Sequence, residues 1–233
     1  MSSRRQLLYS GLALLFCFIL FELTPLDIWL QQWFYDGRQQ AWLWSKEEPV
    51  ARLLLYNGPK ALLILFALTL MTGLAFCRRW RRLSAHCRGI RIVVLSLMLV
   101  PMSVSALKAT TNVACPRSLQ AFDGELPYVK VLESYPPGSR PDSRQRCFPA
   151  GHASGGFALM SLMFLFRTPQ RRRYALLFGL SAGWITGFYK MVIGDHFFSH
   201  TLFSMFLAWF IINLIVLAEG RIFRKRPPAV AEE

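Results

Sequence analysis

The sequence predicts an all-α membrane protein, a six-transmembrane helical bundle with an outside loop between the third and fourth spans. Hydrophobic residues make up 54% of the chain, and they gather in runs near the length of about 20 residues that a helix needs to cross a bilayer. The runs cover residues 7–24, 53–76, 90–107, 150–166, 174–193 and 197–218. Six spans in 233 residues leave room for a single membrane domain, residues 1–233.

Several uninterrupted apolar runs are shorter than a full span, so polar residues must lie at their ends. Lys108, His152 and Lys190 hold such positions. A polar group at membrane depth is tolerated inside a bundle or a water-filled cavity, where it is a functional candidate. These residues therefore indicate a site near one membrane face.

The basic residues predict the orientation of the bundle. With the N-terminus inside, 16 of the 27 basic residues lie on one side, at 4–5, 78–91, 167–173 and 221–226. Only 3 of the 13 acidic residues lie on that side. By the positive-inside rule this side is the cytoplasm, so both termini are expected there. The net charge of +14 does not indicate a nucleic-acid partner, because the arginines flank spans and form no soluble domain.

An aromatic segment, residues 25–52, joins the first two spans on the outside. Its density of rings is typical of a segment at the headgroup boundary. The rings belong to Trp29, Trp33, Phe34, Tyr35, Trp42 and Trp44. They either anchor the fold or form a wall that guides a lipid headgroup into the site.

The loop from about 109 to 149 has candidate residues at both ends. Lys108 stands before its start, and His152 follows its end. Pro149 is expected to open the fourth span, because proline is favoured just inside a helix start. The free amides near Gly151 and His152 would then favour a bound anion.

A second pair of histidines stands between the fifth and sixth spans. If Gly194 makes the turn and the sixth helix starts near Asp195, His196 lies in its first turn and His200 one turn deeper on the same face. One imidazole can then orient the other. A histidine nucleophile needs this, since its attacking nitrogen must be unprotonated and its other nitrogen held.

In their order and spacing, these residues resemble the type 2 phosphatidic acid phosphatase superfamily of integral membrane lipid phosphate phosphatases, which shares its site with vanadate haloperoxidases. That family has a lysine seven residues before Arg-Pro, a Pro-Ser-Gly-His box, and Ser-Arg followed by a spaced histidine and aspartate. Lys108 and Pro116 match the first motif; Pro149, Gly151 and His152 the second; Lys190 and His196 the spacing of the third.

The resemblance implies roles for these residues. His196 attacks phosphorus to form a phosphohistidine, His152 protonates the leaving oxygen, and Lys108 and Lys190 hold phosphate oxygens. No metal or other cofactor is implied. The lysines have a second interpretation, as ordinary residues whose charged ends reach the membrane interface.

The chain also departs from the family's pattern at several motif positions. Cys115 replaces an arginine, Ala150 a serine, Tyr189 a serine, Lys190 an arginine and His200 the aspartate. Arg117 is a candidate to supply the lost guanidinium. His200 either orients His196 or packs between helices, and a neutral imidazole stabilises an imidazolium less than a carboxylate does.

The cysteines divide between the two sides. Cys115 and Cys147 fall in the outside loop, where an oxidising compartment favours a disulfide between them; two free thiols are the alternative. Cys77 and Cys87 fall on the expected reducing side.

These observations predict a lipid phosphate or diphosphate phosphatase at the outer face of the bacterial inner membrane. The expected partners are the membrane and a substrate such as a polyprenyl diphosphate, phosphatidylglycerol phosphate, phosphatidate or a lipid A phosphate. The alternatives are a lipid phosphotransferase with the same intermediate, and a non-catalytic lipid-phosphate binder or transporter.

Overall fold

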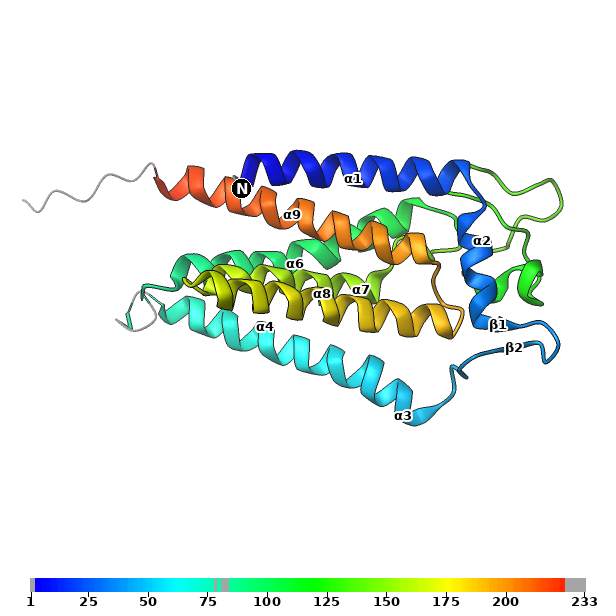
Figure 1. The fold of residues 1–233 in the computed structure, drawn as a ribbon, viewed down its shortest axis with the longest axis horizontal. Coiled ribbons are helices and arrows are strands. Elements are labelled where there is room, and N and C mark those ends of the chain that lie inside the picture. The colour runs from blue at the N-terminus through cyan, green and yellow to red at the C-terminus, as the bar shows by residue number, and fades with distance from the viewer. Residues whose placement is uncertain (1–2, 78, 81–83, 225–233) are drawn as a thin grey trace, which may run out of the picture.

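The protein is a bundle of long helices with its loops gathered at one end (Figure 1). The computed structural model describes residues 3–77, 79–80 and 84–224. The long helices are α1 (Ser3–Leu23), α4 (Gly58–Phe76), α6 (Cys87–Thr110), α8 (Pro169–Val192) and α9 (Phe198–Arg224). Of the residues that predict the orientation, Arg78, Arg81, Arg82, Lys225 and Arg226 lie outside the described residues.

Within the described part of the chain, five helices are long and apolar enough to cross a membrane. They cover Ser3–Leu23, Pro49–Phe76, Cys87–Thr110, Pro169–Val192 and Phe198–Ile222. The second of these includes α3 (Pro49–Arg52), the π-helical turn η2 (Leu53–Asn57) and α4. None of its most apolar window is buried by the rest of the chain. Such a large exposed apolar surface suits a helix that faces lipid.

The fourth expected span is a shorter helix, Gly151–Leu165. It has eight residues of α-helix, α7 (Gly151–Ala158), and seven of 3-10 helix, η5 (Leu159–Leu165). The higher rise of the 3-10 part brings its length to about 26 Å, close to a hydrocarbon core of about 30 Å. That it completes a six-span bundle stays a prediction.

The start of this helix differs from the prediction. Pro149 does not open it; α7 begins at Gly151 with Ala150 as the N-cap residue, and Pro149 follows a cis peptide bond. The backbone N–H of Ala150 donates to the carbonyl oxygen of His200 at 3.1 Å. This bond gives the N–H of the N-cap residue a partner in α9.

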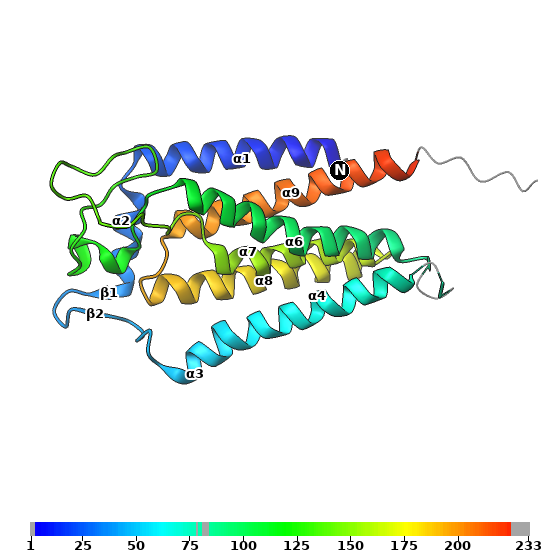
Figure 2. The same ribbon diagram turned by 180° about the vertical axis from the view of Figure 1, so that it is seen from behind.

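The buried core lies where α7, η5 and α8 pack closely beside α6 and α9 (Figure 2). Glycines permit the approach. A Cβ on Gly179 of α8 would stand 2.2 Å from the backbone nitrogen of Met160, and one on Gly156 would stand 2.5 Å from that of Gly183. Small residues at helix contacts are typical of membrane bundles, where backbones pack without a hydrophobic driving force.

A short helix, α2 (Leu26–Gln31), lies across the loop end of the bundle and ties α1 to α8 and α9 (Figure 1). The buried carboxylate of Asp27 accepts hydrogen bonds from the backbone N–H and the hydroxyl of Ser199, and Gln31 donates to the carbonyl oxygen of Met191 at 2.8 Å. Burial raises the pKa of Asp27 to about 6, although its bonds to Ser199 act in the opposite direction. Asp27 thus accepts hydrogen bonds from the first turn of α9.

The aromatic segment is divided between two surroundings. After the 3-10 turn η1 (Gln32–Phe34), β1 (Tyr35–Asp36) and β2 (Ala41–Trp42) form an antiparallel hairpin with Tyr35 opposite Trp42. Both rings pack on Phe122, beside η3 (Pro116–Ser118) and η4 (Gln120–Phe122) of the long loop. Trp29 and Trp33 are exposed instead and border an apolar cavity. The hairpin therefore has a packing role, whereas the rings of Trp29, Trp33 and Trp44 are exposed.

Cys77 and Cys87, which were expected on the reducing side, are joined in a disulfide, with Cα atoms 5.6 Å apart. Cys77 lies at the end of α4 and Cys87 at the start of α6, and these helix ends meet at the end of the bundle opposite the long loop (Figure 1). A count of charges on each side does not predict this proximity.

Candidate active site

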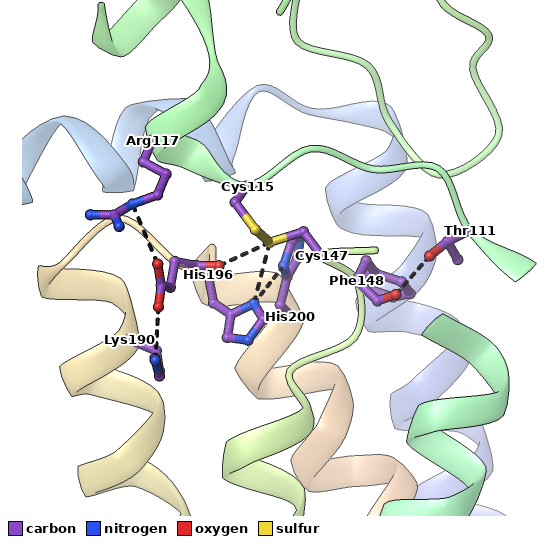
Figure 3. Close-up of a disulfide and its surroundings, with 9 residues drawn as sticks. Thr111, Cys115, Arg117, Cys147, Phe148, Lys190, His196 and His200 are labelled. Carbon is purple, nitrogen blue, oxygen red and sulfur yellow. Dashed lines mark hydrogen bonds and ion pairs between the residues drawn. A yellow bond between two sulfur atoms is a disulfide. The ribbon is translucent and has the colours of Figure 1, made fainter. Parts of the chain in front are cut away.

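The site lies at the loop end of the bundle, where a disulfide and hydrogen bonds join the segment after α6 to the segment before α7. Cys115 and Cys147 form the expected disulfide, with Cα atoms 5.2 Å apart (Figure 3). Beside it, the Thr111 hydroxyl donates to the carbonyl oxygen of Phe148 at 2.7 Å, and the Cys147 N–H donates to that of Val113 at 3.0 Å. These bonds hold the end of α6, which carries Lys108, against the start of α7, which carries His152.

His196 and His200 are both buried, with exposed fractions of 4% and 2%. The turn differs from the prediction: α9 begins at Phe198, so His196 precedes the helix and His200 lies in its first turn. Gly194 adopts a φ of +76°, and the backbone N–H groups of Asp195 and His196 both donate to the carbonyl oxygen of Lys190. This closed turn keeps His196 out of α9 but still places it beside His200.

The two Nδ1 atoms of His196 and His200 lie 3.5 Å apart (Figure 3). The Sγ atom of Cys147 is also 3.5 Å from Nδ1 of His196, but a disulfide sulfur has no proton to donate. Nδ1 of His196 is therefore the nitrogen that His200 can hold, which leaves Nε2 for a ligand. Burial, then the charges of His200, Lys108, His152 and Lys190, lower the pKa of His196 well below its ordinary value. His196 is thus a neutral imidazole at neutral pH, as a nucleophile requires.

His152 stands at the open side of the site, with its ring centroid 6.5 Å from that of His196. A third ring joins it: Tyr56, in η2, lies 4.6 Å from the His152 ring, and the ammonium of Lys190 lies 4.4 Å over the same Tyr56 ring. Lysine over an aromatic face is a favourable cation–π geometry. Tyr56 therefore links the second motif to the third.

Lys108 and Gly151 also meet here. A Cβ on Gly151 would stand 3.8 Å from Nζ of Lys108, so the bare backbone of Gly151 faces this ammonium. The charges of Lys190 and Lys108 act on His152; the carboxylate of Asp195 opposes them, and the exposed Lys60 of α4 adds a smaller contribution. The cations outnumber the carboxylate, so the site suits an anion.

Arg117, a candidate phosphate ligand, contacts the turn that carries His196. Its guanidinium donates to the carbonyl oxygen of Ile193 at 2.6 Å, and its Nε lies 3.3 Å from the carboxylate of Asp195. The second contact is an ion pair without hydrogen-bond alignment. Asp195 also accepts from Lys190 at 2.8 Å. Arg117 therefore braces the turn that carries His196, and its role in substrate binding stays a prediction.

Tyr56 and Lys60 are site residues that the sequence analysis did not identify. The sequence feature that could have indicated them is the polar stretch 56–60. It interrupts the apolar run 53–76 near its expected outer end, as Lys108 follows the outer end of the run 90–107. By its spacing alone, this stretch is an ordinary span end.

Cys147, His196 and His200 bring potential metal ligands within 4.8 Å of one another. Metal binding requires a thiolate, and the sulfur of Cys147 is in a disulfide. The group therefore offers a metal two imidazoles, fewer than the three or four protein ligands of typical zinc sites.

The motifs lie within a region shared with known proteins. A family model, the PAP2 superfamily, matches residues 89–224, more than half of the chain. The chain belongs to the PAP2 superfamily. Members of this superfamily are generally phosphatases, which indicates a phosphatase-type activity for this chain. Searches among curated proteins and among solved structures returned no match.

The match begins in α6, so the helices before it lie outside the matched region. From that part come Tyr56 and Lys60 at the site, Asp27 against Ser199, and Trp42 against Gly194. The N-terminal segment thus completes the surroundings of the motif residues.

Proposed function

We propose that the protein is a lipid phosphate or diphosphate phosphatase, active at the outer face of the bacterial inner membrane through a phosphohistidine. The observation that carries the proposal is the position of His196, whose Nδ1 lies beside His200 while His152 stands on the open side. A bundle with large lipid-exposed helices suits a substrate that resides in the membrane. The substrates expected are polyprenyl diphosphate, phosphatidylglycerol phosphate, phosphatidate and lipid A phosphates.

The first chemical step transfers the phosphoryl group to the protein. Nε2 of His196 attacks phosphorus, and the bond from phosphorus to the lipid oxygen breaks. His152, whose protonated form is favoured by the negative charge of the bound phosphate, gives its proton to that oxygen. Lys108 and Lys190 bind the charged phosphate oxygens, where their ammonium groups stabilise the transition state.

The second step restores the enzyme. His152, now a base, takes a proton from water, whose oxygen attacks phosphorus and breaks the bond to Nε2. Inorganic phosphate and neutral His196 result. With a lipid hydroxyl in place of water, the same step is phosphotransfer, so the assay must measure both free phosphate and phosphorylated acceptor.

The test is phosphate release by pure, detergent-solubilised protein from each of the four substrate classes. His196→Ala should reduce turnover by about a thousandfold or more, because the attacking nitrogen is lost. His86→Ala, a change of the same type at an exposed residue beside α6, should keep normal turnover. A His196→Ala protein that retains a tenth of the normal rate would remove His196 from the role of nucleophile.

A further inference from the structure

Asp195 immediately precedes the proposed nucleophile, and its carboxylate lies between the cations of Lys190 and Arg117. Dashed lines in Figure 3 mark these two contacts of Arg117 and Lys190. One oxygen accepts a hydrogen bond from the ammonium of Lys190 at 2.8 Å, and the other lies 3.3 Å from Nε of Arg117. A carboxylate held by a lysine and an arginine occupies the kind of surroundings that a phosphate oxygen prefers. The motif pattern assigns no role to this residue.

The backbone around Asp195 is braced on several sides. The N–H of Asp195 donates to the carbonyl oxygen of Lys190 at 2.8 Å, and Arg117 binds the carbonyl oxygens of Ile193 and Gly194. On the outside, the ring of Trp42 packs so closely on Gly194 that a Cβ there would lie 2.4 Å from it. The carboxylate is therefore anchored by the turn, whereas Lys190 has a flexible four-carbon stem.

The ammonium of Lys190 already has several neighbours, among them the ring of Tyr189 at 5.7 Å. Besides Asp195, its ammonium lies over the ring of Tyr56, which in turn contacts the ring of His152. Lys190 thus lies between the acidic turn and the open side of the site. A small rotation of its stem would exchange the carboxylate for an oxygen of a phosphate bound beside His152.

We propose that Asp195 is a resident anion that competes with phosphate for Lys190. In the empty site it neutralises Lys190 and limits repulsion with Lys108; when a phosphoryl group binds, Lys190 changes partner. After hydrolysis the carboxylate regains Lys190 and weakens the hold on inorganic phosphate. Asp195 therefore sets phosphate affinity and promotes product release, an inference that rests on the proposed function.

The decisive measurement is the Kd of inorganic phosphate for the full-length His196→Ala protein with and without Asp195→Asn. Loss of the competing charge should tighten phosphate binding about tenfold, since one opposite charge within about 4–6 Å shifts a charged equilibrium by at least that factor. Glu125→Gln, which removes the same charge from an exposed site in the outer loop, should leave the Kd within about twofold, because solvent screens it. An unchanged or weaker affinity after Asp195→Asn would overturn the competition.

A second measurement needs no change at Asp195 and so does not depend on whether that variant folds. In the His196→Ala protein with ¹⁵N-labelled lysine, saturating inorganic phosphate should shift the Lys190 ammonium resonance, which Lys190→Arg identifies by its disappearance. A Lys190 resonance that stays in place at saturation would contradict the exchange of partners.

Both measurements use a variant that cannot form the phosphohistidine. They therefore separate the two proposals. If the variants bind phosphate as expected but the unmodified protein releases none from any lipid substrate, the proposed function is refuted, and the competition between Asp195 and phosphate for Lys190 remains. Conversely, if the protein is an active phosphatase but Asp195→Asn leaves the Kd of inorganic phosphate unchanged, only the role of Asp195 is refuted.

Discussion

Two neighbouring imidazoles replace the histidine–carboxylate pair of the family pattern. Since Nδ1 of His196 lies 3.5 Å from Nδ1 of His200, a single proton between them fixes both tautomers. If His196 donates this proton, its Nε2 has a free lone pair for attack. The rings of Phe148 and Phe197 stand edge-on to His200, so the pair is shielded from water that could replace either partner.

At residue scale, the prediction concerns His200. His200→Ala should reduce turnover by about 10- to 1000-fold, less than the loss of the nucleophile, because His196 remains but is no longer oriented. His200→Asp should keep or raise turnover, since a carboxylate stabilises the imidazolium form better. Turnover at saturating lipid is the measurement for both. If the alanine variant has full turnover and a folded aspartate variant has none, His200 only packs α9.

At the scale of elements, the site depends on how closely the helix of His152 approaches the helix of Lys190. Gly151–Leu165 and α8 meet through glycines whose missing side chains let the backbones touch. Any separation of these two elements would move His152 away from Lys190 and from the turn that carries His196. The glycines thus control the distance between two motifs without contacting the substrate.

Gly179→Ala tests this contact. Its Cβ would stand 2.2 Å from the backbone nitrogen of Met160, which cannot yield as a flexible side chain could. We expect a loss of stability of about 2 kcal/mol from overpacking, with reduced turnover. Gly73→Ala in the lipid-facing α4 is the matched control: nothing lies within 4 Å of its Cβ, so Tm and turnover should hold or rise slightly. Equal effects of the two changes on Tm would show that the close approach is unimportant.

On the scale of the whole molecule, covalent links lie at both ends of the bundle. Cys115–Cys147 joins segments 32 residues apart and places a sulfur against Nδ1 of His196, whereas Cys77–Cys87 joins the end of α4 to the start of α6 at the other end. The first link belongs to the site, and the second holds two helices together far from it. Their removal should therefore have different consequences.

Replacing both cysteines of a pair by serine separates these roles. Cys115→Ser with Cys147→Ser should lower stability by on the order of 3 kcal/mol, from the freed chain entropy of the unfolded state. Turnover should fall about 10- to 100-fold, because the motifs at the two ends of the long loop lose their alignment. Cys77→Ser with Cys87→Ser should lower Tm and leave turnover near normal. Similar turnover in the two double variants would contradict a catalytic role for the outer bridge.

The sequence by itself determined the helical membrane class, the approximate limits of five long helices, the outer disulfide and the family. These depend on hydrophobic run lengths, on compartment and on ordered spacing, which are properties of the chain in one dimension. Motif spacing also predicted the approach of His196 to His200, although both helix starts were placed wrongly. Contacts between distant segments accompany those starts: the N–H of Ala150 donates to the carbonyl oxygen of His200, and the N–H of Ser199 donates to Asp27.

Only the tertiary structure decided which partners the charged groups have. The contacts of Tyr56 with His152 and Lys190, of Asp195 with Lys190 and Arg117, and of Cys77 with Cys87 join different helices or loops. Helix packing sets these distances to within a few tenths of an ångström, and close packing has no periodic signature in the sequence. For that reason the sequence predicts only a span end at residues 56–60, and the structure shows that this stretch lies beside His152.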